Sequence, residues 1–244
     1  MPAELRALWR PFEERCAAGG LDLVQAFGVE AFNRGAHPHE RLPGFGRANA
    51  LGLVVGNTRR LWDPFREAIR ADARLRSLAH PLDEYVATLV TRAAATLAPR
   101  ALLFFAHVVE PAPIPIQRIA EAAGLAQLSP SHLSVHPIYG PWIALRAVVV
   151  IDVELVELVE LVEPEPAVGP ARRPCDACAR PCMPAFEEAL RTATATGAPL
   201  GAAIRDDFHA WVRVRAVCPV GRAHRYDDGQ IEYHYAKNRA RLVE

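Results

Sequence analysis

The fold is decided by residues 134–152, which read SVHPIYGPWIALRAVVVID. Their second half, residues 143–151, is almost uninterrupted aliphatic sequence rich in β-branched side chains, which is typical of a strand buried on both faces in the middle of a sheet. Their first half contains Pro137 and Pro141, which lack a backbone N–H, and Gly140, which can adopt a positive φ. The stretch therefore predicts a rigid loop that is carried by the most buried strand of the domain.

Helices and strands are expected to alternate upstream of this strand. Apolar residues at helical spacing predict a helix over residues 2–18, which the glycine pair after it would end. Further helices are expected from Thr58, a candidate N-cap, to 71, then over 81–99 and 116–123. Strands are expected over 21–32, 50–55 and 100–109. His107, inside the last of these, is expected to be a buried core histidine rather than a ligand.

Composition excludes several classes of protein. The 28 Lys and Arg residues balance the 28 Asp and Glu residues, so no electrostatic argument favours a nucleic-acid partner. The N-terminus has no apolar core behind basic residues, and the longest apolar run is far shorter than a membrane span. We therefore expect a cytoplasmic chain without a membrane partner, either a monomer or a homodimer. Its 244 residues can form one large domain or two small ones.

Two other segments contain residue types that occur in chemical sites. The loop over residues 33–47 contains His37 and His39, and we favour a solvated loop over a metal-binding pair. The triplet Glu-Leu-Val is repeated over residues 154–162 before a proline-rich stretch. There we expect an exposed edge strand with a solubilising row of glutamates rather than a catalytic carboxylate cluster.

Four of the five cysteines form a pattern. Cys175, Cys178 and Cys182 have the spacing C-x-x-C-x-x-x-C, and Cys218 is followed by a proline. In a reducing compartment, such spacing predicts a metal or redox site, and four thiolates suit either zinc or an iron–sulfur cluster. The alternatives are free redox-active thiols and, less favoured, ordinary core cysteines. Cys16 lies on the apolar side of the first expected helix and is interpreted as a core thiol.

The chain from residue 184 onward is expected to be mostly helical, with helices over 185–192, 200–214 and 228–242. We therefore predict a sheet domain over residues 1–166 and a second segment, over 167–244, that contains the cysteines and packs on the first.

Part of the central stretch resembles a known family. The run HPxYGxWxAxRxVV over residues 136–149 resembles the signature loop and strand of the CblC (MMACHC) type of cobalamin-processing protein, and it is similar to the matching stretch of corrinoid-dependent epoxyqueuosine reductases. The tail over residues 218–233 resembles the C-terminal part of CblC-type proteins. The resemblance implies a nitroreductase-like α/β fold, with a mixed or antiparallel sheet flanked by helices and a helical, cysteine-containing C-terminal extension. It also implies corrinoid contacts from His136, Pro137, Tyr139, Gly140, Trp142 and Arg146.

The same resemblance implies a function. The chain would bind cobalamin and remove its upper ligand, either by reductive decyanation with electrons from a reduced flavin such as FMN, or by dealkylation with glutathione. Arginine forks suit the carboxylates of glutathione, and the candidates are Arg146, Arg215, Arg225 and Arg241. An iron–sulfur cluster at the cysteines would supply electrons internally. No individual catalytic residue is predicted.

Three alternatives stay open at this point: a corrinoid-dependent reductase of an organic substrate, a non-catalytic cobalamin carrier and a flavoprotein that shares only the fold. The cysteines lack the second full set that the reductases carry, which weakens the first of these. All the cobalamin interpretations require a cavity beside Tyr139 and Trp142.

Overall fold

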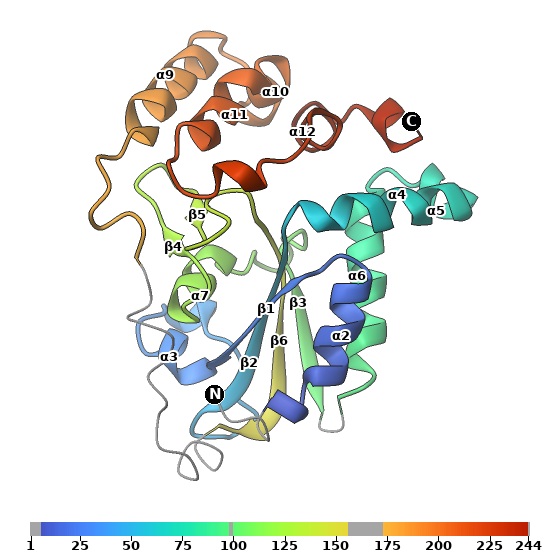
Figure 1. Cartoon of the computed structure of the whole chain (residues 1–244). Helices are drawn as coiled ribbons and strands as arrows, with labels where there is room; N and C mark the ends of the chain where they lie inside the picture. Colours follow the sequence, from blue (N-terminus) through green and yellow to red (C-terminus); the bar gives the residue numbers. More distant parts are fainter. Residues whose placement is uncertain (1–5, 98–99, 156–172, 244) are drawn as a thin grey trace.

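The computed structural model describes residues 6–97, 100–155 and 173–243. Its centre is an antiparallel sheet with the strand order β1–β2–β6–β3 (Figure 1). The strands are β1 (Leu23–Gly28), β2 (Ala50–Asn57), β6 (Ala144–Glu154) and β3 (Ala101–Phe105), and β4 (Gln127–Leu128) pairs separately with β5 (Ser134–Val135). The expected class, an antiparallel sheet flanked by helices, is confirmed.

Strand β6 is the buried strand that the sequence predicts. It pairs with β2 on one side and with β3 on the other. Ala147, Val149 and Ile151 point into one core, and Val148 and Val150 point into the core on the opposite face. None of these five side chains is more than 2% exposed. An uninterrupted aliphatic run was needed because both faces of this strand are covered.

Helices cover both faces of the sheet (Figure 1). The first core contains residues from α2 (Arg10–Ala18), α4 (Trp62–Ala71), α5 (Ala73–Ser77) and α6 (Pro81–Ala94). The second core contains residues from α3 (Val29–Asn33) and α7 (Ile116–Ala122). Thr58 does cap a helix, since its Oγ1 accepts a hydrogen bond from the N–H of Arg60 at the start of the short 3₁₀ turn before α4.

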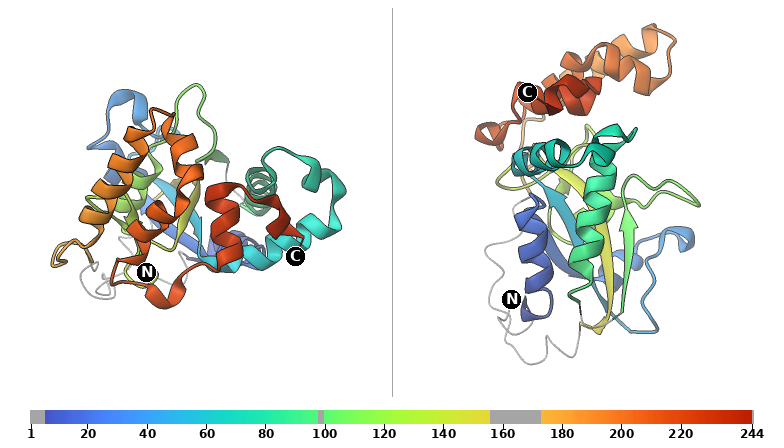
Figure 2. Two further views of the ribbon diagram at one scale, coloured as in Figure 1. Left: turned by 90° about the horizontal axis from the view of Figure 1, so that it is seen from above. Right: turned by 90° about the vertical axis from the view of Figure 1, so that its right-hand side faces the viewer.

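The C-terminal helices lie beyond the end of the sheet at which β6 begins (Figures 1 and 2). They are α9 (Cys182–Ala195), α10 (Leu200–Asp206), α11 (Phe208–Ala216) and α12 (Asp228–Ala236). The helix expected over 200–214 is interrupted at Asp207, whose carboxylate caps α11. Tyr233 and Leu242 belong to the first core, so this region packs on the sheet. The predicted boundary at residue 166 lies outside the described residues, and the division into two domains stays a prediction.

Three local predictions were wrong. The first strand ends at Gly28, because the chain turns into α3 where the side chain of Asn49 accepts a hydrogen bond from the N–H of Glu30. Strand β3 ends at Phe105, since its pairing with β6 stops there, and His107 is exposed in the following turn rather than buried.

The start of the Glu-Leu-Val repeat lies in β6, and residues 156–172 are outside the described part of the chain. The carboxylate of Glu154 accepts hydrogen bonds from the N–H groups of Ala48 and Asn49, so it fixes the entry to β2 instead of only facing water. Among the described residues, no helix is long and apolar enough to cross a membrane.

Candidate functional site

The loop before β6 is rigid for a local reason. His136 and Gly140 exchange two backbone hydrogen bonds of 2.9 Å. The His136 Nδ1 accepts hydrogen bonds from the N–H groups of Ile138 and Tyr139, at 3.1 and 3.3 Å. Burial lowers the pKa of His136 to about 4, so the ring is neutral near pH 7 and Nδ1 remains an acceptor. The preformed loop that the prolines and Gly140 predict is therefore present.

This loop is packed against the C-terminal region. Gly140 and Gly221 both have positive φ, and a Cβ added to Gly140 would lie 2.0 Å from the carbonyl oxygen of Val220. The Tyr139 ring meets the ring of His224 edge-on, at 4.8 Å between centroids. Only glycine permits this approach of two backbones, which explains why one is needed on each side.

Trp142 is buried under the same region. It is 1% exposed, its ring meets Tyr226 edge-on at 5.7 Å, and the guanidinium of Arg225 lies 5.9 Å from its centroid. In this conformation Trp142 supports Tyr226 and does not present a face to a ligand. The binding roles expected of this tryptophan and of the loop residues 136, 137, 139 and 140 stay predictions.

A cleft opens further along the chain, at the start of β6. Its volume is about 410 Å³, and it lies between Ala144 on β6 and residues of the C-terminal helices. We call it the polar cleft, and its polar lining comprises Arg146, Arg205, Arg215, Tyr226, His234, Tyr235 and Lys237. The cavity expected beside the aromatic loop residues is thus displaced toward Arg146, the one predicted contact that lines it.

The polar cleft is marked by buried polar atoms without hydrogen-bond partners. Within the described residues these include Nη2 of Arg146, Nε of Arg215, Oη of Tyr226 and Nε2 of His234. Each buried group left unpaired costs about 1–3 kcal/mol of stability. Native proteins have few such groups, and those that occur call for an explanation such as a bound ligand or water. Four of them around one cleft, most of them donors, indicate a site built to hydrogen-bond with a ligand.

Hydrogen bonds to other parts of the fold hold the guanidinium groups of Arg146 and Arg215 in place. The Nε of Arg146 donates to Oδ1 of Asn57 at 2.7 Å, and Asn57 is fully buried at the end of β2. The Nη1 of Arg215 donates to the carbonyl oxygens of Pro141, at 2.7 Å, and Ile143, at 3.5 Å. Each guanidinium is therefore oriented by the fold and keeps an unpartnered nitrogen.

Burial sets the protonation of the cleft. It raises the pKa of Tyr226 to about 12, so the phenol keeps its proton and can donate. It lowers the pKa of His234 well below the usual value, and the neighbouring Arg146 adds to this effect, so the imidazole is neutral. The lining includes arginines and a lysine but no Asp or Glu within the described residues. The cleft therefore favours anionic or carbonyl-rich ligands.

The structure separates the four arginine candidates. Arg146 and Arg215 line the polar cleft. Arg225 is paired with Asp228 and lines a second cleft of about 500 Å³, which also has Tyr226 in its wall. Arg241 is paired with Glu232 at 2.9 Å and lies away from the polar cleft's lining.

The four patterned cysteines lie together. All of them line one small pocket between residues 129–135, the segment 174–182 and the end of α11, which we call the cysteine pocket. Burial, and next the proximity of Cys218, raises the pKa of Cys175 to about 11. Among the described residues, no three His, Cys, Asp or Glu side chains are arranged to hold a metal ion as they stand, so the predicted metal is not shown. Cys16 is fully buried in the first core, as expected.

Sequence reasoning missed Tyr226, His234 and Lys237. Only the tail pattern that resembles CblC-type proteins pointed to this region, and it did not single out these side chains. No local periodicity could have found them, because their partners on β6 are far away in the sequence.

Comparisons with known proteins decide the fold family. No family model matches the sequence, and no curated protein matches it. Among solved structures, the crystal structure of a C. elegans B12-trafficking protein CblC, a human MMACHC homologue, superimposes with a TM-score of 0.66. The two sequences are 18% identical, and the match covers 99% of this chain and 96% of the other. The chain has the CblC fold. The match runs nearly end to end, so the C-terminal helices belong to the CblC fold as much as the sheet does, and the resemblance drawn from residues 136–149 is confirmed at the level of the fold.

Proposed function

We propose that this chain binds a cobalamin in the polar cleft and removes its upper ligand, by reductive decyanation or by dealkylation. The observation that carries the proposal is the group of four unpartnered buried polar atoms on a cleft in a CblC fold. The proposal does not depend on any metal at the cysteines.

The residues of the cleft fit a corrinoid. Such a ligand is a broad, rather apolar ring edged with amides and linked to a phosphate-bearing tail. Amide oxygens would accept hydrogen bonds from Tyr226 and Arg146, and a phosphate or carboxylate suits the fork of Arg215. Tyr226 stands in the walls of both clefts, so a ligand larger than either one could extend across it.

The chain's own residues supply binding and exclusion rather than proton transfer. With Arg146 turned to the corrinoid, Arg215 would hold a carboxylate of a thiol such as glutathione beside the ligand, and the neutral His234 would hydrogen-bond without adding charge. In dealkylation the thiolate attacks the alkyl carbon, a thioether forms, and the bonding electron pair stays with cobalt. In decyanation a reduced flavin such as reduced FMN would supply the electron that takes cobalt from +3 to +2, and the upper ligand would leave as the cyanide anion.

A non-catalytic cobalamin carrier is the second candidate. It is favoured by the description of the solved neighbour as a B12-trafficking protein. A carrier would bind the same ligand in the same cleft but leave its upper ligand in place under reducing conditions.

Spectroscopic titration tests the proposal. The full chain is mixed with cyanocobalamin and, separately, methylcobalamin, and the visible spectrum is followed before and after adding glutathione or reduced FMN. We expect saturable binding and loss of the upper ligand, and binding without ligand loss would instead identify a carrier.

The variant Arg215→Met should weaken binding, because the half-buried guanidinium that lines the cleft is removed. Arg213→Met is the matched control, since Arg213 lies on the same helix but is exposed. Absence of binding in the unmodified chain, or equal effects of the two variants, would refute the assignment of the cleft.

A further inference from the structure

The cysteine pocket lies outside the polar cleft and has its own chemistry. We propose that it binds one metal centre, a zinc ion or an iron–sulfur cluster, through the four thiolates of Cys175, Cys178, Cys182 and Cys218. Two segments far apart in the sequence bring these thiols to one place: the first three come from the turn before α9 and its first residue, and the fourth follows α11. Convergence of four thiols from two segments is typical of a closed thiolate site.

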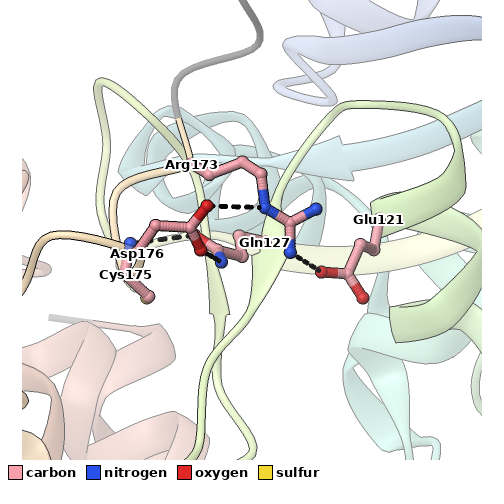
Figure 3. Close-up of polar contacts among 5 residues, drawn as sticks. All are labelled: Glu121, Gln127, Arg173, Cys175 and Asp176. Atoms are coloured by element: carbon pink, nitrogen blue, oxygen red, sulfur yellow. Dashed lines mark hydrogen bonds and ion pairs between the residues drawn. The ribbon is translucent and has the colours of Figure 1, made fainter.

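The first segment is held in position without a metal (Figure 3). The side-chain oxygen of Gln127 accepts a hydrogen bond from the N–H of Cys175 at 2.8 Å, and its nitrogen donates to Asp176 at 2.6 Å. Asp176 is also paired with Arg173, which reaches Glu121. Gln127 is 8% exposed on β4, so this clamp ties the cysteine turn to the folded domain. The position of the cysteine turn is therefore fixed by the protein itself before any metal binds.

Among the residues that the structure describes, the lining of the cysteine pocket provides no metal-coordinating side chain of the usual kinds other than the thiols. Apart from Ser129, Ser131, Arg180 and the thiols, the lining is proline and aliphatic: Pro130, Leu133, Val135, Pro141, Pro174, Pro181, Val214, Pro219 and Val220. A buried thiolate in apolar surroundings needs a cation beside it, and a coordinating metal deprotonates the thiol outright. Since no histidine or carboxylate lines the pocket in the described part of the chain, any metal there would be bound by sulfur, which favours zinc and iron–sulfur centres.

Binding requires the thiols to turn toward one point. A cysteine reorients by rotation about a single side-chain bond, and metal sites commonly form only as the metal binds. The N–H of Arg180 already lies 3.4 Å from Sγ of Cys178, in the manner of the backbone N–H groups that hydrogen-bond to coordinated sulfur.

The centre would also stiffen a wall of the polar cleft. Val214 lines the cysteine pocket and the next residue, Arg215, lines the polar cleft. Pro141 lines the cysteine pocket and accepts the hydrogen bond of Arg215. A metal that joins Cys182 at the start of α9 to Cys218 after α11 would hold this corner in place. We expect slower backbone hydrogen exchange over residues 212–222 in the metal-loaded chain.

Elemental analysis of the full chain tests the proposal. The protein is purified anaerobically, and zinc, iron and acid-labile sulfide are measured before and after separate reconstitution with zinc and with iron plus sulfide. Zinc at about one equivalent identifies a single ion, and iron with matching sulfide and a broad visible absorption identifies a cluster. X-ray absorption at the bound metal should count four sulfur ligands.

Variants identify the ligands. Cys178→Ser and Cys218→Ser should each lose the metal, while Cys16→Ala, at a buried cysteine in the first core, should keep it. Circular dichroism reports whether each variant is folded. A wild-type chain that takes up neither zinc nor iron under these conditions overturns the proposal, as does a centre with fewer than four sulfur ligands. These readouts do not involve cobalamin, so they stand apart from the proposed function.

Discussion

The polar cleft and the cysteine pocket lie on either side of the end of α11, and they are built on opposite principles. Val214 faces the cysteine pocket, whose lining is largely aliphatic, whereas Arg215 faces the polar cleft, which has four buried polar atoms without partners. The cleft offers fixed hydrogen-bonding groups to a large polar ligand. The pocket offers soft sulfur atoms in largely aliphatic surroundings. Adjacent residues of one helix can therefore serve two unrelated chemistries, because successive side chains point in different directions.

Both regions depend on the contact between the loop before β6 and residues 220–221, and breaking it should have the largest effect. Gly140→Ala combines a positive φ with a Cβ 2.0 Å from a backbone oxygen, so we expect a loss of about 2–5 kcal/mol in the free energy of unfolding. Gly124→Ala has a similar φ and open space around it, so only about 1–2 kcal/mol should be lost.

Denaturant unfolding of the two glycine variants measures this difference. Equal losses in Gly140→Ala and Gly124→Ala would mean that the close approach of the two backbones contributes nothing, and the joint between the loop and the C-terminal region would have to be reconsidered.

The second-largest effect is expected from removing the charge of Arg146, which should change the polar cleft but not the cysteine pocket. Arg146→Met deletes a buried donor of the cleft, and a hydrogen bond from a charged group is worth about 1.5–3 kcal/mol, so cobalamin affinity should fall about 10- to 150-fold. The metal content of the cysteine pocket should not change. The two quantities are measured by spectroscopic titration and by elemental analysis of the same preparation. Parallel loss of both would show that the variant damages the fold rather than the cleft.

Asn57 should have a smaller, indirect effect. It contacts Arg146 through a 2.7 Å hydrogen bond but does not line the cleft, so it acts as a positioning residue. Asn57→Ala should lower cobalamin affinity about 3- to 10-fold. In the Arg146→Met background the same change should have no further effect on affinity, because the group that it positions is gone. Additive effects in this double-mutant cycle would contradict the positioning role.

The pH dependence of stability gives the smallest signal. The pKa of His136 is about 4 in the fold, below the usual 6.5, so the folded chain binds fewer protons than the unfolded chain between these values. Stability should therefore fall as the pH is lowered from about 6.5 toward 4 and should be flat for this group above that window. In His136→Gln, the slope of the unfolding free energy against pH should be smaller by the equivalent of up to one proton. The slope that remains includes the contribution of His234, whose pKa is also lowered. The control is His39→Gln, at an exposed position in the short 3₁₀ helix Pro38–Glu40, and all variants are measured by denaturant unfolding at several pH values.

Much of the fold could be predicted from local patterns. The aliphatic run of β6 identified a strand buried on both faces. The sequence patterns located α4, α6 and α7 to within about five residues at each end, and they located the end of α2, which begins at Arg10 rather than at residue 2. Gly28 and Asp207 were missed as break points, because the first depends on the side chain of Asn49 from another strand and the second on a cap that competes with helix continuation.

The candidate site was predicted only in part. The pattern around Arg146 located one wall of the cleft, but Trp142 was expected to face a ligand and is instead buried against Tyr226. Burial depends on what packs over a residue, and here the cover comes from a segment more than eighty positions later.

The sequence alone determined the central strand, the stiff loop before it and the presence of four cysteines at metal-ligand spacing, because each of these depends on neighbours in the chain. Tertiary structure alone decided that Arg146, Arg215, Tyr226 and His234 share one cleft and that their polar atoms have no partners. A hydrogen bond is satisfied or left open by whatever lies within about 3 Å in space, and sequence patterns carry no record of those distances.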